Sequence, residues 1–274
     1  MRLTPAAVRE LLDRHGITPS RALGQNFMVD PNTIDRIVRL VGIHRDDAVI
    51  EIGAGVGSLT VALAETGARV VALEADRHLL GPLREVMADH DVDIVHADAM
   101  TFDWLDHLQG EEHWKLVANL PYNVATPLVL EVLDRVPTIV ELTFLVQREV
   151  AERLVAPAGS RTYGVPSLRV AYWATAEIVA RIPATVFHPR PRVESALVQL
   201  VRRPAPAADA PLGPLFELIR AAFGQRRKML RRSLGHVVTI EQFAAADVSP
   251  EVRPETLELG DWDRLARVVA GSAS

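Results

Sequence analysis

The chain has 274 residues, of which 49% are hydrophobic and 24% are charged, which is enough for one large α/β domain and a small appendage. It contains no cysteine, which excludes a disulfide framework and a thiolate zinc site. No apolar stretch approaches the roughly 20 residues of a membrane-spanning helix. Residues 1–16 have the pattern of a capped amphipathic helix and lack the apolar region of a signal peptide. We therefore expect a cytoplasmic protein without membrane contact.

The net charge of −5 argues weakly against a nucleic-acid partner, but this charge is unevenly distributed. Residues 1–201 contain 19 Lys and Arg against 26 acidic residues, a balance of −7. Residues 202–274 contain 11 against 9, a balance of +2. A basic patch can therefore exist in the C-terminal part of an acidic chain.

Short apolar runs alternate with amphipathic helical patterns over most of the chain. The predicted strands lie at residues 48–53, 68–74, 92–97, 115–119 and 141–147. Helical patterns between them, such as residues 58–67 and 126–136, predict βαβ units and a parallel sheet with helices on both faces. Two later apolar runs, around residues 172–182 and 194–203, have no comparable helix between them and predict an antiparallel pair that closes the sheet.

The domain boundary is predicted at a proline-rich stretch. Residues 202–214 contain four prolines among small residues, a composition typical of an interdomain linker. Downstream, residues 214–237 and a segment ending at 262–271 have helical patterns. The expected organisation is a catalytic domain at 1–203, a linker at 204–214 and a small helical domain at 215–274.

Glycines follow the first predicted strand, in the order Gly53-Ala54-Gly55-Val56-Gly57, and a helix pattern begins at once. Glycines at such a turn let the backbone approach a ligand, and the helix N-terminus offers N–H donors. The spacing departs from the GxGxxG dinucleotide fingerprint, and a tight turn that only packs the helix is the alternative.

Two acidic residues follow the next two predicted strands. Glu74 closes the second strand, 21 residues after Gly53, and Asp98 follows the third. A carboxylate in the first position can accept hydrogen bonds from both hydroxyls of a ribose. Either acid alone could instead cap a helix. Because the carboxyl ends of neighbouring parallel strands lie together, the glycines and both acids predict a nucleoside cofactor.

The fourth predicted strand ends in Asn119-Leu120-Pro121-Tyr122. An exocyclic adenine amine is a poor nucleophile because its lone pair is delocalised into the ring. The Asn119 amide oxygen and a neighbouring main-chain carbonyl could accept both of its N–H bonds, and Pro121 would stiffen the backbone at Leu120. Tyr122 offers a flat face on which a flipped-out base can stack. The alternative is a plain turn with the tyrosine in the core.

The chain resembles the bacterial ribosomal RNA adenine dimethylases, in particular the branch that dimethylates two adjacent adenosines near the 3′ end of small-subunit RNA. Besides the motifs above, the resemblance rests on residues 23–30 (LGQNFMVD), 147–154 (QREVAERL), 187–196 (FHPRPRVESA) and 222–228 (AFGQRRK). Ala54 replaces a usual proline and Ala125 a usual serine. Neither difference removes a group that must react.

The resemblance implies a Rossmann-like class I methyltransferase sheet, S-adenosylmethionine as the methyl donor and no metal. It also implies that residues 1–30 form a lid and RNA-contact segment. The roles it implies for single residues are as follows: Asn26 and Met28 fold against the cofactor, Gly53 and Gly55 contact its methionine part, Glu74 its ribose and Asp98 its adenine; Asn119 touches the cofactor and, with Leu120, the target amine, while Tyr122 and Phe187 sandwich the target base.

Basic residues suggest where RNA binds. The resemblance places Arg148 near the RNA, and no acid interrupts residues 225–236, which begin with Gln225 and Arg226. On a continuous helix, Arg227 and Arg231 would stand four residues apart, as would Lys228 and Arg232, which makes a double row of positive charge. The alternative is a solvated face. The expected partner is small-subunit ribosomal RNA, bound by a monomer.

Three other functions compete with this interpretation. An antibiotic-resistance dimethylase acting on large-subunit RNA would have the same fold and chemistry. A non-catalytic ribosome-assembly factor would not need Glu74, Asp98 and Asn119 together. A nicotinamide dehydrogenase is disfavoured because the sequence offers no candidate residues for hydride chemistry.

Overall fold

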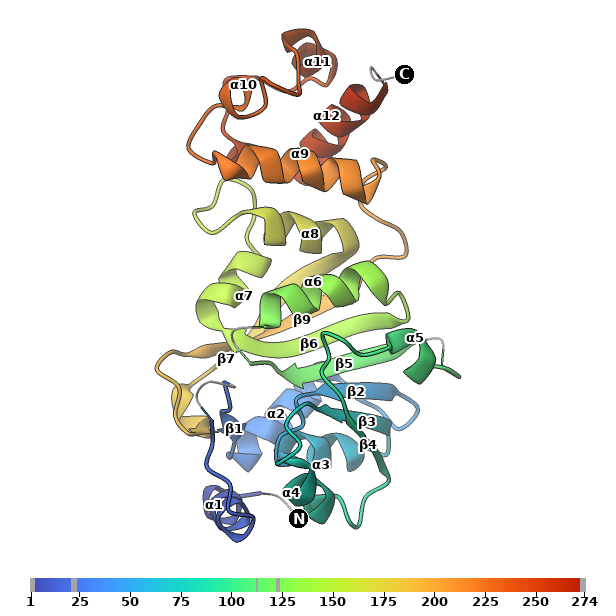
Figure 1. Ribbon diagram of the computed structural model, residues 1–274, viewed down its shortest axis with the longest axis vertical. Coiled ribbons are helices and arrows are strands. Elements are labelled where there is room, and N and C mark those ends of the chain that lie inside the picture. Colours follow the sequence, from blue (N-terminus) through green and yellow to red (C-terminus); the bar gives the residue numbers. More distant parts are fainter. Residues whose placement is uncertain (1–2, 21–23, 112, 122–123, 272–274) are drawn as a thin grey trace. The chain divides into compact units, whose positions relative to one another are not determined.

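The computed structural model describes residues 3–20, 24–111, 113–121 and 124–271, and Figure 1 shows its elements. The chain forms two compact units. The first comprises Met1–Ala151 and Glu177–Arg202, and the second comprises Glu152–Ala176 and Arg203–Ser274.

A seven-stranded sheet organises the first unit. Its strand order is β4-β3-β2-β5-β6-β9-β7. The strands are β2 (Ala48–Ile52), β3 (Arg69–Glu74), β4 (Val92–His96), β5 (Trp114–Asn119), β6 (Ile139–Gln147), β7 (Ala174–Ile182) and β9 (Ser195–Arg202). The first five are parallel, and β9 joins β6 antiparallel. All five predicted parallel strands are confirmed, and the two later runs lie side by side at the end of the sheet.

Helices alternate with strands along this part of the chain. They are α1 (Pro5–Arg14), α2 (Pro31–Val41), α3 (Ser58–Ala64), α4 (Leu80–Val86), α5 (Trp104–His107), α6 (Ala125–Arg135) and α7 (Arg148–Leu154), with a short 3-10 helix η1 (Ala184–Val186). Ile37 of α2 and Leu63 of α3 are fully buried and share one core cluster with Val49 of β2. Burying side chains of this size contributes about 1.5–3 kcal/mol each.

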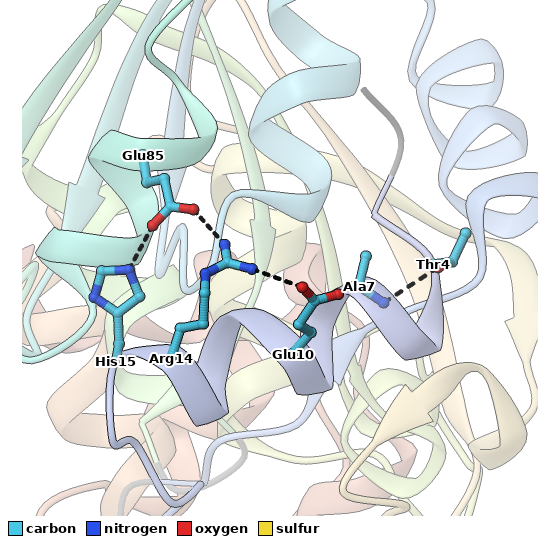
Figure 2. Close-up of polar contacts among 6 residues, drawn as sticks. All are labelled: Thr4, Ala7, Glu10, Arg14, His15 and Glu85. Atoms are coloured by element: carbon cyan, nitrogen blue, oxygen red, sulfur yellow. Dashed lines mark hydrogen bonds and ion pairs between the residues drawn. The ribbon is translucent and has the colours of Figure 1, made fainter.

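Helix α1 is capped by Thr4, whose hydroxyl accepts a hydrogen bond from the Ala7 N–H at 3.3 Å. Figure 2 shows how its other end is attached to α4. Arg14 and His15 both contact the Glu85 carboxylate, the second at 2.6 Å. These two partners lower the pKa of Glu85, His15 contributing most. The predicted N-terminal amphipathic helix is confirmed.

Strands β1 (Phe27–Met28) and β8 (Phe187–His188) form a separate antiparallel pair, in which Met28 faces Phe187. Successive side chains of a strand point to opposite sides. Phe27 therefore packs with α1 and with Leu79, whereas Met28 and Phe187 pack into the core cluster under α2. This pair links the segment after α1 to the residues around Phe187, within the first unit.

The second unit is helical, as predicted. Its elements are α8 (Val165–Trp173), α9 (Leu212–Gly224), α10 (Leu230–Ser233), α11 (Ile240–Ala245), η2 (Pro254–Thr256) and α12 (Leu259–Gly271). Phe216, Phe243 and Trp262 are fully buried at its centre. The stretch expected as a linker is part of this unit, because the N–H of the buried Ala210 donates to the Asp263 carboxylate at 2.7 Å.

One helix prediction and one strand prediction near this unit need correction. The continuous helix expected over residues 214–237 is wrong, because α9 ends at Gly224 and only the four-residue α10 follows. Leu230 is fully buried, and its N–H donates to the Val252 carbonyl at 2.8 Å instead of to a helical partner. Tertiary packing thus overrides helix propensity here. The strand expected around residues 172–182 begins at Ala174, since Tyr172 and Trp173 end α8.

Candidate active site

A cavity of about 530 Å³ opens at the carboxyl ends of the parallel strands. It lies where β2 is flanked by β3 on one side and β5 on the other, the switch point at which open α/β sheets bind ligands. Its lining consists of residues 24–27, 73–79, 96–100 and 119–121 together with Ile52, Gly53, Gly55, Val124 and Leu128. The predicted Gly53, Gly55, Glu74, Asp98 and Asn119 therefore meet in one cavity.

The glycine loop brings backbone close to the cavity wall. Gly53 and Gly55 have φ values of 73° and 61°, in the left-handed region that side chains rarely adopt. A Cβ on Gly55 would also lie only 3.1 Å from the Phe27 ring. Only glycine fits this position without displacing the aromatic ring.

The Glu74 carboxylate is fixed by the loops around it. One oxygen accepts the Gly55 N–H at 2.7 Å, and the other accepts the Asp76 N–H at 2.8 Å. Burial raises the pKa of Glu74, while these two hydrogen bonds oppose the shift. A carboxylate has about four acceptor positions, so both oxygens keep the capacity to accept a ligand hydroxyl. This residue can bind a diol.

Asp98 lies at the rim, at the end of β4. One of its oxygens accepts the Met100 N–H at 2.9 Å, and its side chain is exposed. This bond stabilises the turn, and Asp98 and Met100 both line the cavity. Such an acceptor can pair with an exocyclic amine.

Asn119 lies at the end of β5, next to the buried Leu120. Its amide nitrogen donates to the Asn26 main-chain carbonyl at 2.9 Å. Because that bond uses the NH₂ group, the amide oxygen is left as an acceptor, and Asn119 lines the cavity. The Asn26 side chain in turn donates to the Gly24 carbonyl at 3.0 Å. The segment before β1 thus orients the residue expected to touch the target amine.

Two expected site residues, both described by the structure, are not in the cavity lining. Met28 and Phe187 are 3% and 4% exposed, and both pack in the core beneath α2. The alternation of β1 places Phe27, not Met28, on the cavity side. Tyr122 lies outside the described residues.

Some cavity residues were missed from the sequence. Gln25 and Phe27 lie within the recognised 23–30 motif, but nothing in its letters said which side chains face the ligand. Asp76 follows Glu74 by two residues and repeats the signal of an acid after a strand, so it could have been identified. Met100 contributes apolar lining that no sequence pattern marks.

Behind the glycine loop lies a second, deeply buried acid. Glu51 of β2 is 1% exposed, and its Oε2 has no hydrogen-bond partner among the described residues. Burial, reinforced by the negative charge of Glu74, raises the pKa of Glu51 to about 8. Glu51 is therefore largely protonated at neutral pH.

This shift predicts a pH-dependent stability. Because the pKa is raised from 4.5 to about 8, the folded chain binds this proton more tightly than the unfolded chain, and stability falls as pH rises through that window. We expect Glu51→Gln to lessen the fall by a few kcal/mol, since one pKa unit corresponds to about 1.4 kcal/mol. Urea denaturation from pH 5 to 8 measures it, with Glu141→Gln of β6 as control. Identical slopes in all three proteins would contradict a buried neutral Glu51.

The basic residues expected to bind RNA lie in different surroundings. Arg148 at the start of α7 pairs with Glu194 at 3.0 Å. Arg226 pairs with Glu255 at 2.6 Å and donates to two main-chain carbonyls.

Arg227, Lys228, Arg231 and Arg232 do not form the expected double row, because only the last two are helical. Acids from elsewhere also reach this stretch, since Arg231 lies 3.6 Å from Glu251. All four side chains are nevertheless exposed.

In the part of the chain that the structure describes, no helix is long and apolar enough to cross a membrane. The same residues contain no group of three or more His, Asp and Glu side chains arranged to bind a metal ion.

Known proteins resemble this chain over most of its length. Residues 18–270 match the family model described as ribosomal RNA adenine dimethylase. A Kineococcus radiotolerans protein named ribosomal RNA small subunit methyltransferase A is 46% identical over 99% of this chain and 93% of its own length.

Two solved structures share the fold. A dimethyladenosine transferase from Plasmodium falciparum has a TM-score of 0.74 at 21% identity, covering 86% of this chain and 94% of that one. The 23S rRNA methyltransferase ErmE has a TM-score of 0.68 at 25% identity, covering 89% and 100%. The sheet, its glycine loop and the match over nearly the whole length lead to one assignment. The chain belongs to the ribosomal RNA adenine dimethylase family.

Proposed function

We propose that this protein transfers methyl groups from S-adenosylmethionine to the N6 amines of two adjacent adenosines near the 3′ end of small-subunit ribosomal RNA. Family membership supports the adenine substrate. The observation that carries the proposal is the Asn119 side chain, whose oxygen is left as an acceptor in the cavity that Glu74 also lines. An amine acceptor and a diol acceptor in one cavity suit a reaction between a nucleoside cofactor and a base.

The residues present suit the cofactor. Glu74 would bind the ribose hydroxyls, Asp98 the adenine amine, and the Gly53–Gly55 backbone the methionine part. Asn26, in the segment before β1, would also contact the cofactor. The bound donor supplies a methyl group already activated by a sulfonium, so no metal and no strong base are needed.

The chain's own residues would position the nucleophile. Asn119 Oδ1 and the Leu120 carbonyl would accept the two N–H bonds of the target amine and favour a tetrahedral nitrogen. This arrangement would direct the nitrogen lone pair at the methyl group that the bound donor supplies, and the nitrogen would lose its proton to solvent. Alignment supplies most of the acceleration in such a reaction.

Aromatic stacking is proposed for the target base. Tyr122 follows Pro121 directly, and we expect Tyr122→Ala to lose stacking worth about 1–3 kcal/mol, with Tyr122→Phe milder. Phe187 is proposed as the second face. Its ring is buried, so this role requires the base to displace core contacts around β8.

The small-subunit substrate is supported by the name of the Kineococcus relative, which is 46% identical. The 23S rRNA methyltransferase ErmE is a more distant match, at 25% identity. A non-catalytic assembly factor is disfavoured by the convergence of the cofactor and amine residues in one cavity. We further propose that the protein acts in the cytoplasm as a monomer, which analytical ultracentrifugation would test.

Exposed basic residues of the second unit are proposed to bind RNA phosphates. Changing Arg227, Lys228 and Arg232 to Gln is expected to weaken RNA binding and to lower the slope of log K against log salt by roughly 2 to 3. Arg226 and Arg231 are left out because they pair with acids. Titrations of small-subunit RNA at several salt concentrations measure the slope.

Three exposed arginines of the first unit, Arg36, Arg39 and Arg45, provide the matched control when changed to Gln. This variant removes the same charge from a different surface. S-adenosylmethionine affinity should be unchanged in both variants. Equal salt slopes in the two triple variants would mean that the second-unit residues form only a solvated surface.

Undermethylated small and large ribosomal subunits, incubated separately with labelled S-adenosylmethionine, test the proposed substrate. The proposal predicts label in small-subunit RNA alone. Label confined to large-subunit RNA would favour the resistance-type activity, and no label in either would favour an assembly factor.

A further inference from the structure

Hydrogen bonds connect two segments that line the cavity, the one before β1 and the loop after β3. Gln25 Nε2 donates to Asp76 Oδ2 at 2.8 Å, joining residues that are 51 positions apart. The same side chain accepts the Ser20 N–H through Oε1 at 2.7 Å, and the Gln25 N–H donates to the Ser20 carbonyl at 3.1 Å. Gln25 therefore uses both ends of its amide.

Each end of this chain leads to a different part of the site. Asp76 donates its own N–H to Glu74 and accepts the His78 N–H at 3.0 Å, which fixes its carboxylate. Asn26, the neighbour of Gln25, accepts the Asn119 amide through its carbonyl at 2.9 Å. The backbone that carries this carbonyl is thus tied to the loop after β3.

We propose that Gln25 and Asp76 are a positioning pair that orients Asn119 through the Asn26 carbonyl. The pair acts through Asn26 and Asn119 rather than on the reacting atoms, and the inference rests on the proposed function. Without the pair, the segment before β1 loses its side-chain anchor to the β3 loop. The Asn26 carbonyl then no longer fixes which end of the Asn119 amide faces the target amine.

The chemistry of the pair permits an exchange of polarity. Gln25→Glu keeps an oxygen for the Ser20 N–H but sets a second carboxylate against Asp76. Asp76→Asn keeps an oxygen for the His78 N–H but sets an NH₂ group against the Gln25 NH₂ group. The double variant restores one donor and one acceptor, because the amide introduced at position 76 can donate to the carboxylate introduced at position 25.

Single-turnover methylation of small-subunit RNA at saturating S-adenosylmethionine tests the pair. Each single variant is expected to lose at least about tenfold in rate, since a displaced positioning group commonly costs that much or more. The Gln25→Glu/Asp76→Asn double variant should recover most of the loss, with the RNA affinity of all three unchanged. Failure of the double variant to recover, or wild-type rates in both single variants, would overturn the proposal.

A matched control comes from α5. Gln109 donates to Asp106 at 3.3 Å on the exposed surface, outside the cavity lining. Gln109→Glu makes the same charge contact and should methylate at the wild-type rate. If wild-type protein labels no RNA at all, the proposed function fails rather than the pair. The pair is then judged from calorimetry, which should show weaker S-adenosylmethionine binding in the single variants and recovery in the double one.

Discussion

Asn119→Ala is expected to lower kcat by about 10²–10³-fold, the range found when one preorganised polar contact to a reacting centre is removed. The Asn119 amide nitrogen donates to the Asn26 carbonyl, which leaves the amide oxygen as an acceptor on a residue that lines the cavity. Without this acceptor, the lone pair of the target amine stays delocalised into the adenine ring. Single-turnover kinetics with saturating small-subunit RNA measure the effect.

Asn119→Asp separates orientation from acceptor chemistry. A carboxylate can still accept from an amine, but it cannot donate to the Asn26 carbonyl at 2.9 Å, which it would instead repel. We expect the methylation rate of Asn119→Asp to lie between those of wild type and Asn119→Ala. Circular dichroism should show an unchanged fold in both variants. Near-normal rates in Asn119→Ala would refute the role assigned to this amide.

Glu74→Ala is expected to weaken S-adenosylmethionine binding by about 2–4 kcal/mol, the value of two charge-assisted hydrogen bonds. The substitution also removes two hydrogen bonds within the protein, because it deprives the Gly55 and Asp76 N–H groups of their acceptor. Isothermal titration calorimetry measures the affinity directly.

Glu74→Gln is the conservative companion, since it keeps the shape but presents an NH₂ group to one of the two backbone donors. Its affinity for S-adenosylmethionine should lie between those of wild type and Glu74→Ala. Because burial raises the pKa of Glu74, wild-type affinity should also fall as pH drops through that raised pKa, whereas Glu74→Gln should lack this dependence. Unchanged affinity in Glu74→Ala would rule out the ribose contact.

The cofactor half of the site follows from the sequence because its signals are local. A glycine loop after one strand and an acid after the next lie together whenever parallel strands share an edge, as Gly53, Gly55 and Glu74 do. The five parallel strands were predictable for the same reason, since buried runs bounded by turns mark them.

What could not be predicted depends on contacts between distant segments. The Gln25–Asp76 hydrogen bond joins residues far apart in sequence. The pairing of β1 with β8 buries Met28 and Phe187, and strands of two residues are too short to be predicted from a sequence pattern. The continuous helix predicted over residues 225–236 does not form, because Leu230 packs against a distant loop. No periodicity in the sequence reveals such a contact.

The identity of the methylated atom tests the central claim most directly. Small-subunit RNA labelled by the protein would be digested to nucleosides, analysed by mass spectrometry against N6-methylated standards, and mapped by fragment sequencing. The account predicts N6,N6-dimethyladenosine at two adjacent positions near the 3′ end. Label on a ring nitrogen, a ribose hydroxyl or another base would contradict an amine held by Asn119.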